Sequence, residues 1–551
     1  MKQSGFLAKL VITIFILIII SQVVFVSIYS LPSQKSVISE RISDIKDIES
    51  IKTDNSEKTN GKSVNYFNVC NSSQAEDLKN YSRISNLYIE NMDTSSLKDL
   101  SKIDIHSITL ENVGGFDLSL INPRFLNSIT LNNTKIDDYS YLSSIKNLTH
   151  LTISGGEIKN KDFFNKLTNL KSLVIYDIDL DDISFLEKMQ KLELLSLDFC
   201  NISHISPVSN LKKLKVLSLR SNNITDISPI SSLSDLNSIS LSNNKIKGLA
   251  DFSKIPYPNY IDMSFNNVNE IKLSENSRNF HLDLSYNNID TIDDDIIHLV
   301  RNSNISINLF GNKISNASNL KDISGITYKN QKGEMLTYNQ HTEYLNALDN
   351  FSKTYVSQDW SQLKKAVVIF LVLSKNTEYF YDYNISKSDT STYSHTEYGT
   401  LINKKAVCDG LAFAYRDLLN IHGIKSHIYY GDVNSQADDA THIWNVVYID
   451  SKPYHCDLTT GVISEKNVSD IKYYNISNYL KSILYTFGAS DNQLISKNYF
   501  LQDKSAPKCA DFISESAISN VVYELIEGEE KYFFVEKEKS ENQGGNKDEK
   551  K

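Results

Sequence analysis

The sequence predicts a multidomain chain: an N-terminal transmembrane helix, a solenoid of short strands and turns, and a C-terminal α+β domain. An uncharged apolar run from Leu10 to Leu31 is long enough to cross a bilayer. A 22-residue repeat follows it, and repeats of this length are typical of solenoids. Beyond residue 335 separate helix and strand patterns replace the repeat. A chain of 551 residues is too long for one core, so several folded parts are expected.

The N-terminal run follows two lysines, Lys2 and Lys9, and we expect residues 1–31 to form an uncleaved signal anchor. A cleaved signal peptide is the alternative, because the first half of the run alone would serve as its apolar core. We favour the anchor because no small-x-small cleavage site follows. Each serine that could end such a site has a large apolar residue two places earlier: Ser21, Ser27 and Ser30.

Two polar stretches lie outside the expected folded parts. Residues 32–75 are rich in Ser, Lys, Asp and Asn, and we expect them to form a stalk. Residues 536–551 are charged, and we expect a disordered tail. A net charge of -10 and the lack of a basic face argue against nucleic acid as a partner. The five cysteines have no spacing typical of a metal site or a disulfide framework.

The solenoid is expected over residues 84–326. Each unit should contribute a short strand whose apolar side chains point inward, followed by a turn. A single unit has no closed core, so stacking of neighbouring units supplies it. The strongest units begin with a leucine-rich block every 22 residues: Leu126, Leu148, Leu170, Leu192, Leu214 and Leu236.

Later units carry an asparagine eight places after the block begins, where its side chain can bond the backbone of neighbouring coils: Asn222, Asn244, Asn266, Asn287 and Asn312. Cys200 occupies this position in an earlier unit, which favours a structural role over a reactive one. The outward positions of the strands form a concave surface on which we expect a protein ligand. They include Tyr176, Asp198, Phe199, Arg220, Tyr260, Asp262, Phe265, His281, Asp283 and Tyr286.

This repeat resembles the leucine-rich repeats of bacterial cell-surface proteins of the internalin kind. The phrase Asp-Ile-Ser-Pro-Ile at residues 226–230 is typical of that family. Together with the N-terminal run, the resemblance implies a single-pass protein of the cell membrane, with the bulk of the chain at the bacterial surface.

The C-terminal domain is expected over residues 335–525. Residues 359–382 include an apolar run that is too short and too charged at its ends to span a membrane, which predicts a buried scaffold helix. Cys408 begins a second helix, whose apolar stripe ends before Gly423. A thiol at a helix start lies near the positive end of the helix dipole. Nearby backbone N–H groups favour the thiolate and could receive an oxyanion.

Two strands are expected after this helix, over residues 441–449 and 453–459. If residues 450–451 form a two-residue turn, Ile449 pairs with Lys452 and the register of the whole hairpin follows.

This register pairs Trp444 with Asp457 and puts Asp457 diagonal to His442 on one face of the sheet. A His–Asp pair is therefore plausible from spacing alone. Whether Cys408 lies on the other side of His442 depends on the tertiary fold.

Three blocks in this region resemble the transglutaminase-like superfamily of cysteine enzymes, which has a papain-like α+β fold. They are AVCDGLAFAYRDLLNIHGI, HIWN and YHCDLT, and they occur in the family's order. The resemblance covers about residues 359–511. It implies that Cys408 is the nucleophile, His442 the general base and then acid, and Asp457 the residue that orients the imidazole.

The chain departs from the family pattern at two positions. Ala406 stands where glycine is usual two places before the cysteine, and Pro453 stands where a tryptophan is common. These departures put the fit of a substrate in doubt more than the triad.

Other residues of these blocks are expected to have supporting or structural roles. Trp444 lies two residues from His442 on the same face and should shield the site from water. Cys456 should point to the opposite face and be buried, and we expect His455 to point away from the site. We expect packed or solvated side chains, without catalytic roles, at His395, His422, His427 and Cys509.

The resemblance implies acyl transfer through a thioester, with no metal or organic cofactor. The acceptor decides between crosslinking by a lysine and hydrolysis by water, and the sequence does not select one. The substrate would be a protein or a peptidoglycan-linked peptide, recruited by the solenoid while the C-terminal domain performs the chemistry. The alternative is an adhesion protein in which the C-terminal domain is catalytically silent.

Overall fold

The computed structural model describes residues 62–92, 97, 100–155, 157–315, 320, 323–330, 332–380, 393–433, 441–466, 486–495, 499–500, 509 and 511–527. The expected anchor at 1–31, the stalk as far as residue 61 and the tail at 536–551 lie outside these residues. Among the described residues, the structure contains no helix with the length and apolar character needed to cross a bilayer.

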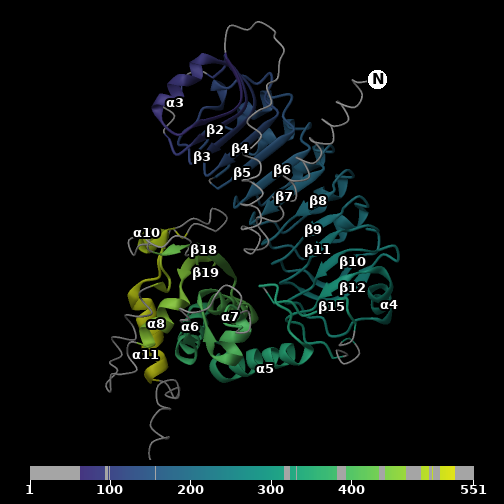
Figure 1. Cartoon of the computed structure of the whole chain (residues 1–551), viewed down its shortest axis with the longest axis vertical. Helices are drawn as coiled ribbons and strands as arrows, with labels where there is room; N and C mark the ends of the chain where they lie inside the picture. Colours follow the sequence, from purple (N-terminus) through teal and green to yellow (C-terminus); the bar gives the residue numbers. More distant parts are fainter. Residues whose placement is uncertain are drawn as a thin grey trace, which may run out of the picture. The chain divides into compact units, whose positions relative to one another are not determined.

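The solenoid is built on one parallel sheet in which strands follow one another almost in sequence order (Figure 1). Register is kept from coil to coil, because Leu151 pairs with Leu173, Leu173 with Leu195, and Leu195 with Leu217. The 22-residue repeat is thus the length of one coil. The strands of the sheet are β1 (Lys62–Val69), β2 (Tyr81–Glu90), β3 (Asp104–Glu111), β4 (Ser128–Asn132), β5 (His150–Ser154), β6 (Ser172–Tyr176), β7 (Leu194–Asp198), β8 (Val216–Ser218), β9 (Ser238–Ser240), β11 (Tyr260–Asp262), β13 (His281–Asp283), β14 (Ser306–Asn308) and β15 (Ile326–Thr327).

The other side of each coil carries short helical turns or a second pair of strands. These elements are α3 (Ser72–Asp77), η3 (Leu78–Asn80), η5 (Leu118–Leu120), η6 (Ser140–Ser144), η7 (Asp162–Lys166), η8 (Ser184–Lys188), η9 (Ser206–Asn210), η10 (Ser228–Ser232), β10 (Lys247–Phe252), β12 (Asn267–Leu273) and α4 (Asp294–Ser303).

The stalk prediction is wrong for residues 62–75. Strand β1 lies at the edge of the large sheet and pairs in parallel with β2, and Val69 is fully buried. Helix α3 follows, with the Asn71 side chain accepting a hydrogen bond from the N–H of Gln74. The sequence of this coil is polar because an edge strand buries few of its side chains, and this polar composition led to the prediction of a stalk.

The buried asparagines form the expected ladder between coils. The side-chain oxygen of Asn222 accepts from the N–H groups of Cys200 and Ile202, at 3.0 Å each. Its amide group donates to the Leu197 and Leu219 carbonyls at 2.7 and 3.0 Å. Cys200 itself is buried at the equivalent position, and its Sγ lies 3.3 Å from the Asp198 carbonyl oxygen. This supports the structural role expected for Cys200.

The C-terminal region contains an antiparallel sheet in the order β20-β19-β18-β21, with helices packed around it. Its elements are α5 (Tyr338–Tyr355), α6 (Gln362–Asn376), β16 (Glu378–Tyr379), η12 (Gly399–Asn403), β17 (Lys405–Ala406), α7 (Cys408–Ile421), β18 (Ser426–Val433), β19 (Thr441–Ile449), β20 (Lys452–Cys456), α8 (Leu458–Lys466), α10 (Asp491–Ile495), β21 (Tyr499–Phe500) and α11 (Glu515–Glu527).

Helix α6 is the buried scaffold helix that the sequence predicts. Each residue from Lys365 to Ser374 is buried. The Tyr415 hydroxyl of α7 donates to the Ala366 carbonyl of α6 at 3.0 Å, and the Phe370 and Tyr415 rings meet edge to face. Helix α6 thereby fixes the helix that begins with Cys408.

Candidate active site in the C-terminal region

The hairpin β19–β20 has the predicted turn. Asp450 and Ser451 both have positive φ, at 49° and 68°, as a two-residue type I′ turn requires. Ile449 pairs with Lys452 and Asn445 with Cys456, which is the predicted register. The hairpin therefore presents His442 and Asp457 on one face.

His442 and Asp457 are in direct contact. The Nε2 atom of His442 lies 2.8 Å from Oδ2 of Asp457, which is only 1 % exposed. The other carboxylate oxygen accepts from the N–H of Thr459 at 3.0 Å, in the first turn of α8. Each oxygen of Asp457 thus has its own donor, and this holds the carboxylate against the imidazole.

Cys408 is the first residue of α7 and is partly exposed. Its sulfur is hydrogen-bonded to the His442 side chain. Since Nε2 of His442 faces Asp457, Nδ1 is the ring nitrogen left for the sulfur. The structure thus brings together the three residues that the sequence selects as a triad.

The electrostatics of His442 reflect these two neighbours. Burial would lower its pKa, but the Asp457 carboxylate and the Cys408 sulfur outweigh burial and raise the pKa of His442 to about 10. An imidazolium is therefore favoured at neutral pH, beside the sulfur.

Asn445, the last residue of the HIWN block, joins the strand to the helix. Its amide nitrogen donates to the Ala412 carbonyl of α7 at 3.0 Å and to the Ser426 hydroxyl of β18 at 3.3 Å. This side chain is fully buried. It sets the distance between the strand that carries His442 and the helix that carries Cys408.

Trp444 lies beside the imidazole. Its indole stacks on the His442 ring, with centroids 5.6 Å apart and planes 28° apart, and it is fully buried. Such a position fits the expected role in shielding His442 from water.

A charged cluster next to the nucleophile was missed by the sequence prediction. Asp409 follows Cys408, and its carboxylate contacts Nδ1 of His395 at 3.0 Å and Nζ of Lys332 at 2.6 Å. Burial would raise the pKa of Asp409, but these two partners lower it below its ordinary value. His395 was expected to be merely packed or solvated, and its distance from Asp409 along the chain gave no signal of pairing.

The first turn of α7 lies very close to the segment that carries His395. A Cβ at Gly410 would lie 2.6 Å from the Ser394 carbonyl oxygen and 2.8 Å from that of Thr396. The Gly410 N–H donates to Asp409 at 2.9 Å. Glycine is needed here because any larger residue would push the segment away from the helix start.

The remaining cysteines have other environments. Cys200, Cys456 and Cys509 are buried, and burial raises the pKa of each thiol, that of Cys456 to about 12. Cys70 is exposed, and its Sγ lies 3.2 Å from the side-chain oxygen of Gln74.

The expectation that His455 points away from the site is wrong. Residues two apart on a strand share a face, so His455 lies on the face of Asp457. Its Nδ1 accepts a hydrogen bond from the indole N–H of Trp444 at 2.9 Å. The alternation of strand residues could have predicted this side.

Several outward positions of the solenoid contact the C-terminal region of the same chain. The Tyr286 hydroxyl donates to Asp417 of α7 at 2.7 Å. The Arg416 guanidinium lies 4.7 Å from the Phe265 ring centroid, and the Phe199 ring meets His427 of β18 edge to face. These three aromatics were expected to meet a partner, and in the structure they contact the chain's own helix and strand.

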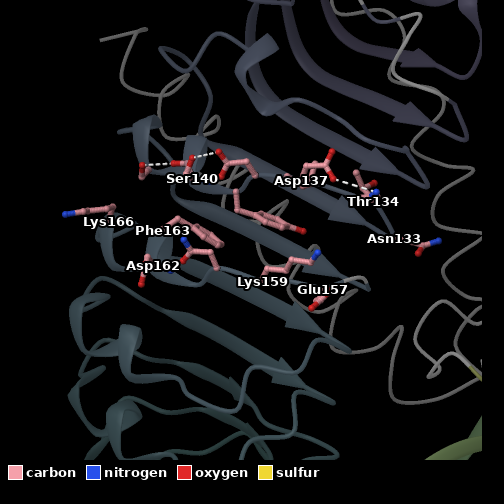
Figure 2. A pocket seen from close by; sticks show the side chains of 15 residues that line it. Asn133, Thr134, Asp137, Ser140, Glu157, Lys159, Asp162, Phe163 and Lys166 are labelled. Carbon is pink, nitrogen blue, oxygen red and sulfur yellow. Dashed lines mark hydrogen bonds and ion pairs between the residues drawn. The ribbon is translucent and has the colours of Figure 1, made fainter.

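A separate hollow of about 540 Å³ lies in the solenoid, between the coils that contain η6 and η7 (Figure 2). The stacked rings of Tyr139 and Phe163 form part of its wall. Acidic and basic side chains both line it, including Asp137, Glu157, Lys159, Asp162 and Lys166. This mixture of charges does not select an anionic or a cationic ligand.

Comparison with known proteins identifies the repeat. A family model for leucine-rich repeats (two copies) matches residues 212–256. No curated protein matches the sequence.

Among solved structures, an internalin from Listeria monocytogenes str. 4b F2365 is 20 % identical with a TM-score of 0.37, over 46 % of this chain and 81 % of that one. Internalin C2 from the same strain is 23 % identical with a TM-score of 0.28, over 33 % and 78 %. The protein in a TLR13–ssRNA13 complex is 16 % identical with a TM-score of 0.30, over 47 % and 56 %. The family match and the parallel coils together show that the chain contains a leucine-rich repeat solenoid, which is similar to internalins.

Proposed function

We propose that the chain is a cell-surface thiol enzyme of the transglutaminase and cysteine-peptidase type, with Cys408, His442 and Asp457 as its triad. The observation that carries this proposal is the 2.8 Å contact between Asp457 and His442, with the Cys408 sulfur bonded to the same imidazole. Enzymes that catalyse covalent acyl transfer use this arrangement, in which a nucleophile contacts a base and the base contacts an orienting carboxylate.

The reaction would proceed through a thioester. The Cys408 thiolate attacks an amide carbonyl carbon, the C–N bond breaks, and the proton on His442 passes to the departing amine or ammonia. An acceptor then gives a proton to His442 and attacks the thioester carbon, and the C–S bond breaks to release the Cys408 thiolate. A lysine amine would give a crosslink, and water would give hydrolysis of the amide. A protein or a peptidoglycan-linked peptide would supply the amide.

The solenoid would bind a protein ligand through outward positions other than those that contact the C-terminal region. Tyr260 and His281 are two outward positions of neighbouring strands, and their rings stack with centroids 5.8 Å apart. Alanine at both should weaken ligand binding and leave the reactivity of Cys408 unchanged. A loss of Cys408 reactivity in this variant would contradict the separation of binding from chemistry.

The proposal also places the chain in the membrane through residues 10–31, with the bulk outside the cell. The motivation is the length of the uncharged run without a good cleavage site. N-terminal sequencing of the mature protein tests this, since a start near residue 31 in a soluble product would exclude an anchor.

Labelling of the full-length protein with iodoacetamide near neutral pH tests the enzyme. We expect Cys408 to react much faster than the exposed Cys70, because an imidazolium at His442 stabilises its thiolate. Buried Cys200, Cys456 and Cys509 should react slowest. Peptide mass spectrometry measures each rate. Equal rates at Cys408 and Cys70 would favour the rival hypothesis, an adhesion protein whose C-terminal domain is catalytically silent.

A further inference from the structure

Trp444 is linked on its far side to two residues that have no part in the triad. Its indole N–H donates to Nδ1 of His455 at 2.9 Å, and Nε2 of His455 lies 2.9 Å from Oδ1 of Asp491 in α10. His455 is fully buried. The same Asp491 oxygen accepts from the backbone N–H of Cys509 at 3.1 Å.

The donors in this chain fix the tautomer of His455. An indole nitrogen can only donate, so Nδ1 of His455 must carry a lone pair. Nε2 then carries the proton and donates it to Asp491. The ring is therefore neutral, with both nitrogens engaged.

The same tautomer argues against a metal ion at this place. Ligand atoms of His455, Asp491 and Cys509 lie within 4.8 Å of one another, a spacing that could suit a metal. A histidine binds a metal through a nitrogen lone pair, and Nε2 has none while Nδ1 accepts from Trp444. The cluster is thus better explained as a hydrogen-bonded support for the indole.

On the side of the active site the indole stacks on two other rings. Its ring lies against His442 and also against Tyr429 of β18, with centroids 5.6 and 4.6 Å apart. Stacking alone allows an indole ring to slide in its own plane. The hydrogen bond from the Trp444 N–H to His455 prevents this movement. The face presented to His442 is therefore set by His455.

We propose that His455 and Asp491 are positioning residues for the reaction, which hold Trp444 so that its π face stabilises the His442 imidazolium. A cation against an aromatic face is favoured electrostatically, and more so when it is desolvated. Among the described residues, Asp457 just after β20 and Cys408 of α7 are ionisable groups that face His442. This inference rests on the proposed function, because it assigns His442 an imidazolium role.

The test is the pH profile of Cys408 alkylation by iodoacetamide in the full-length protein. His455→Leu removes the acceptor for the indole, and it should slow alkylation at pH 7 at least about tenfold and move the profile to higher pH. His455→Asn keeps an oxygen near the position of Nδ1 as an acceptor for the indole but cannot reach Asp491, so alkylation should slow less than in His455→Leu. Added chelator should change neither profile, and a change would overturn the tautomer assignment.

A double-mutant cycle distinguishes the loss of Trp444 positioning from a folding defect in His455→Leu. Trp444→Phe keeps an aromatic face but has no N–H, so His455→Leu should have no further effect on alkylation in that background. Wild-type kinetics in folded His455→Leu, or equal losses with and without Trp444→Phe, would overturn the inference. A wild-type Cys408 that reacts no faster than Cys70 would instead overturn the proposed function.

Discussion

Cys408→Ala is expected to abolish turnover and covalent labelling at the site. Among the described residues, Cys408 is the thiol that is bonded to His442, and no second nucleophile lies in this chain of contacts. Without the sulfur no thioester can form, so the loss should be complete rather than partial. Release of amine from a glutamine-amide or peptide substrate, together with the mass of any acyl-enzyme, measures the effect.

Cys456→Ala is the matched control, because it removes a thiol one residue from Asp457. Cys456 is 1 % exposed, and burial raises the pKa of its thiol to about 12, so it stays protonated at neutral pH. This variant should keep turnover and lose only some thermal stability, because it leaves a small cavity. Activity in Cys408→Ala, or its absence in folded Cys456→Ala, would show that the nucleophile is a different residue.

The parts of the site that the sequence predicts correctly depend on local geometry. A two-residue turn at Asp450 and Ser451 sets the register of the hairpin, and strand alternation then brings His442 and Asp457 to one face. The contacts within the repeat are also local, since each coil contacts mainly the next coil along the chain. The ladder through Asn222 could therefore be predicted from its place in the unit.

The parts that the sequence does not predict depend on contacts distant in the chain. Lys332 and His395 meet at Asp409 only because the segments that carry them pack against the start of α7. Nothing in the spacing of these residues signals that meeting. The pairing of Tyr286 with Asp417 is of the same kind, because a solenoid residue and a helix residue 131 positions away become neighbours through tertiary packing.

These long-range contacts bear on the expected division of labour between the two regions. A fragment starting at residue 335 would lack Lys332, the partner of the Asp409 carboxylate next to the nucleophile. It would also lack the Tyr286 hydroxyl, one of the donors to buried Asp417. Asp409 would keep His395 and Asp417 would keep Tyr344, but each buried carboxylate would lose one partner. We therefore expect this fragment to be less stable than the same region in the full-length chain.

Asp457→Asn is expected to lower turnover by about ten-thousandfold while leaving the Cys408 thiol in place, by analogy with the same change in a serine-protease triad. The N–H of Thr459 donates to Oδ1 of Asp457, so the asparagine oxygen should keep that contact and its NH₂ group should face His442. Nε2 must then accept, which moves the ring proton to Nδ1. A protonated Nδ1 on a neutral ring cannot take the Cys408 proton.

The pH dependence of this variant has a definite direction. In the wild type the pKa of His442 is about 10, so the imidazolium that protonates the departing amine persists until the pH rises through that value. Without the Asp457 charge burial lowers that pKa, and the alkaline limb of the rate profile should move to lower pH. Steady-state rates across pH measure this. Asp511→Asn is the control. It removes an exposed carboxylate that pairs with Lys452, a residue of the β19–β20 hairpin, and its rate profile should match that of the wild type. If Asp457→Asn kept wild-type turnover and its alkaline limb, Asp457 would not be the residue that orients the imidazole.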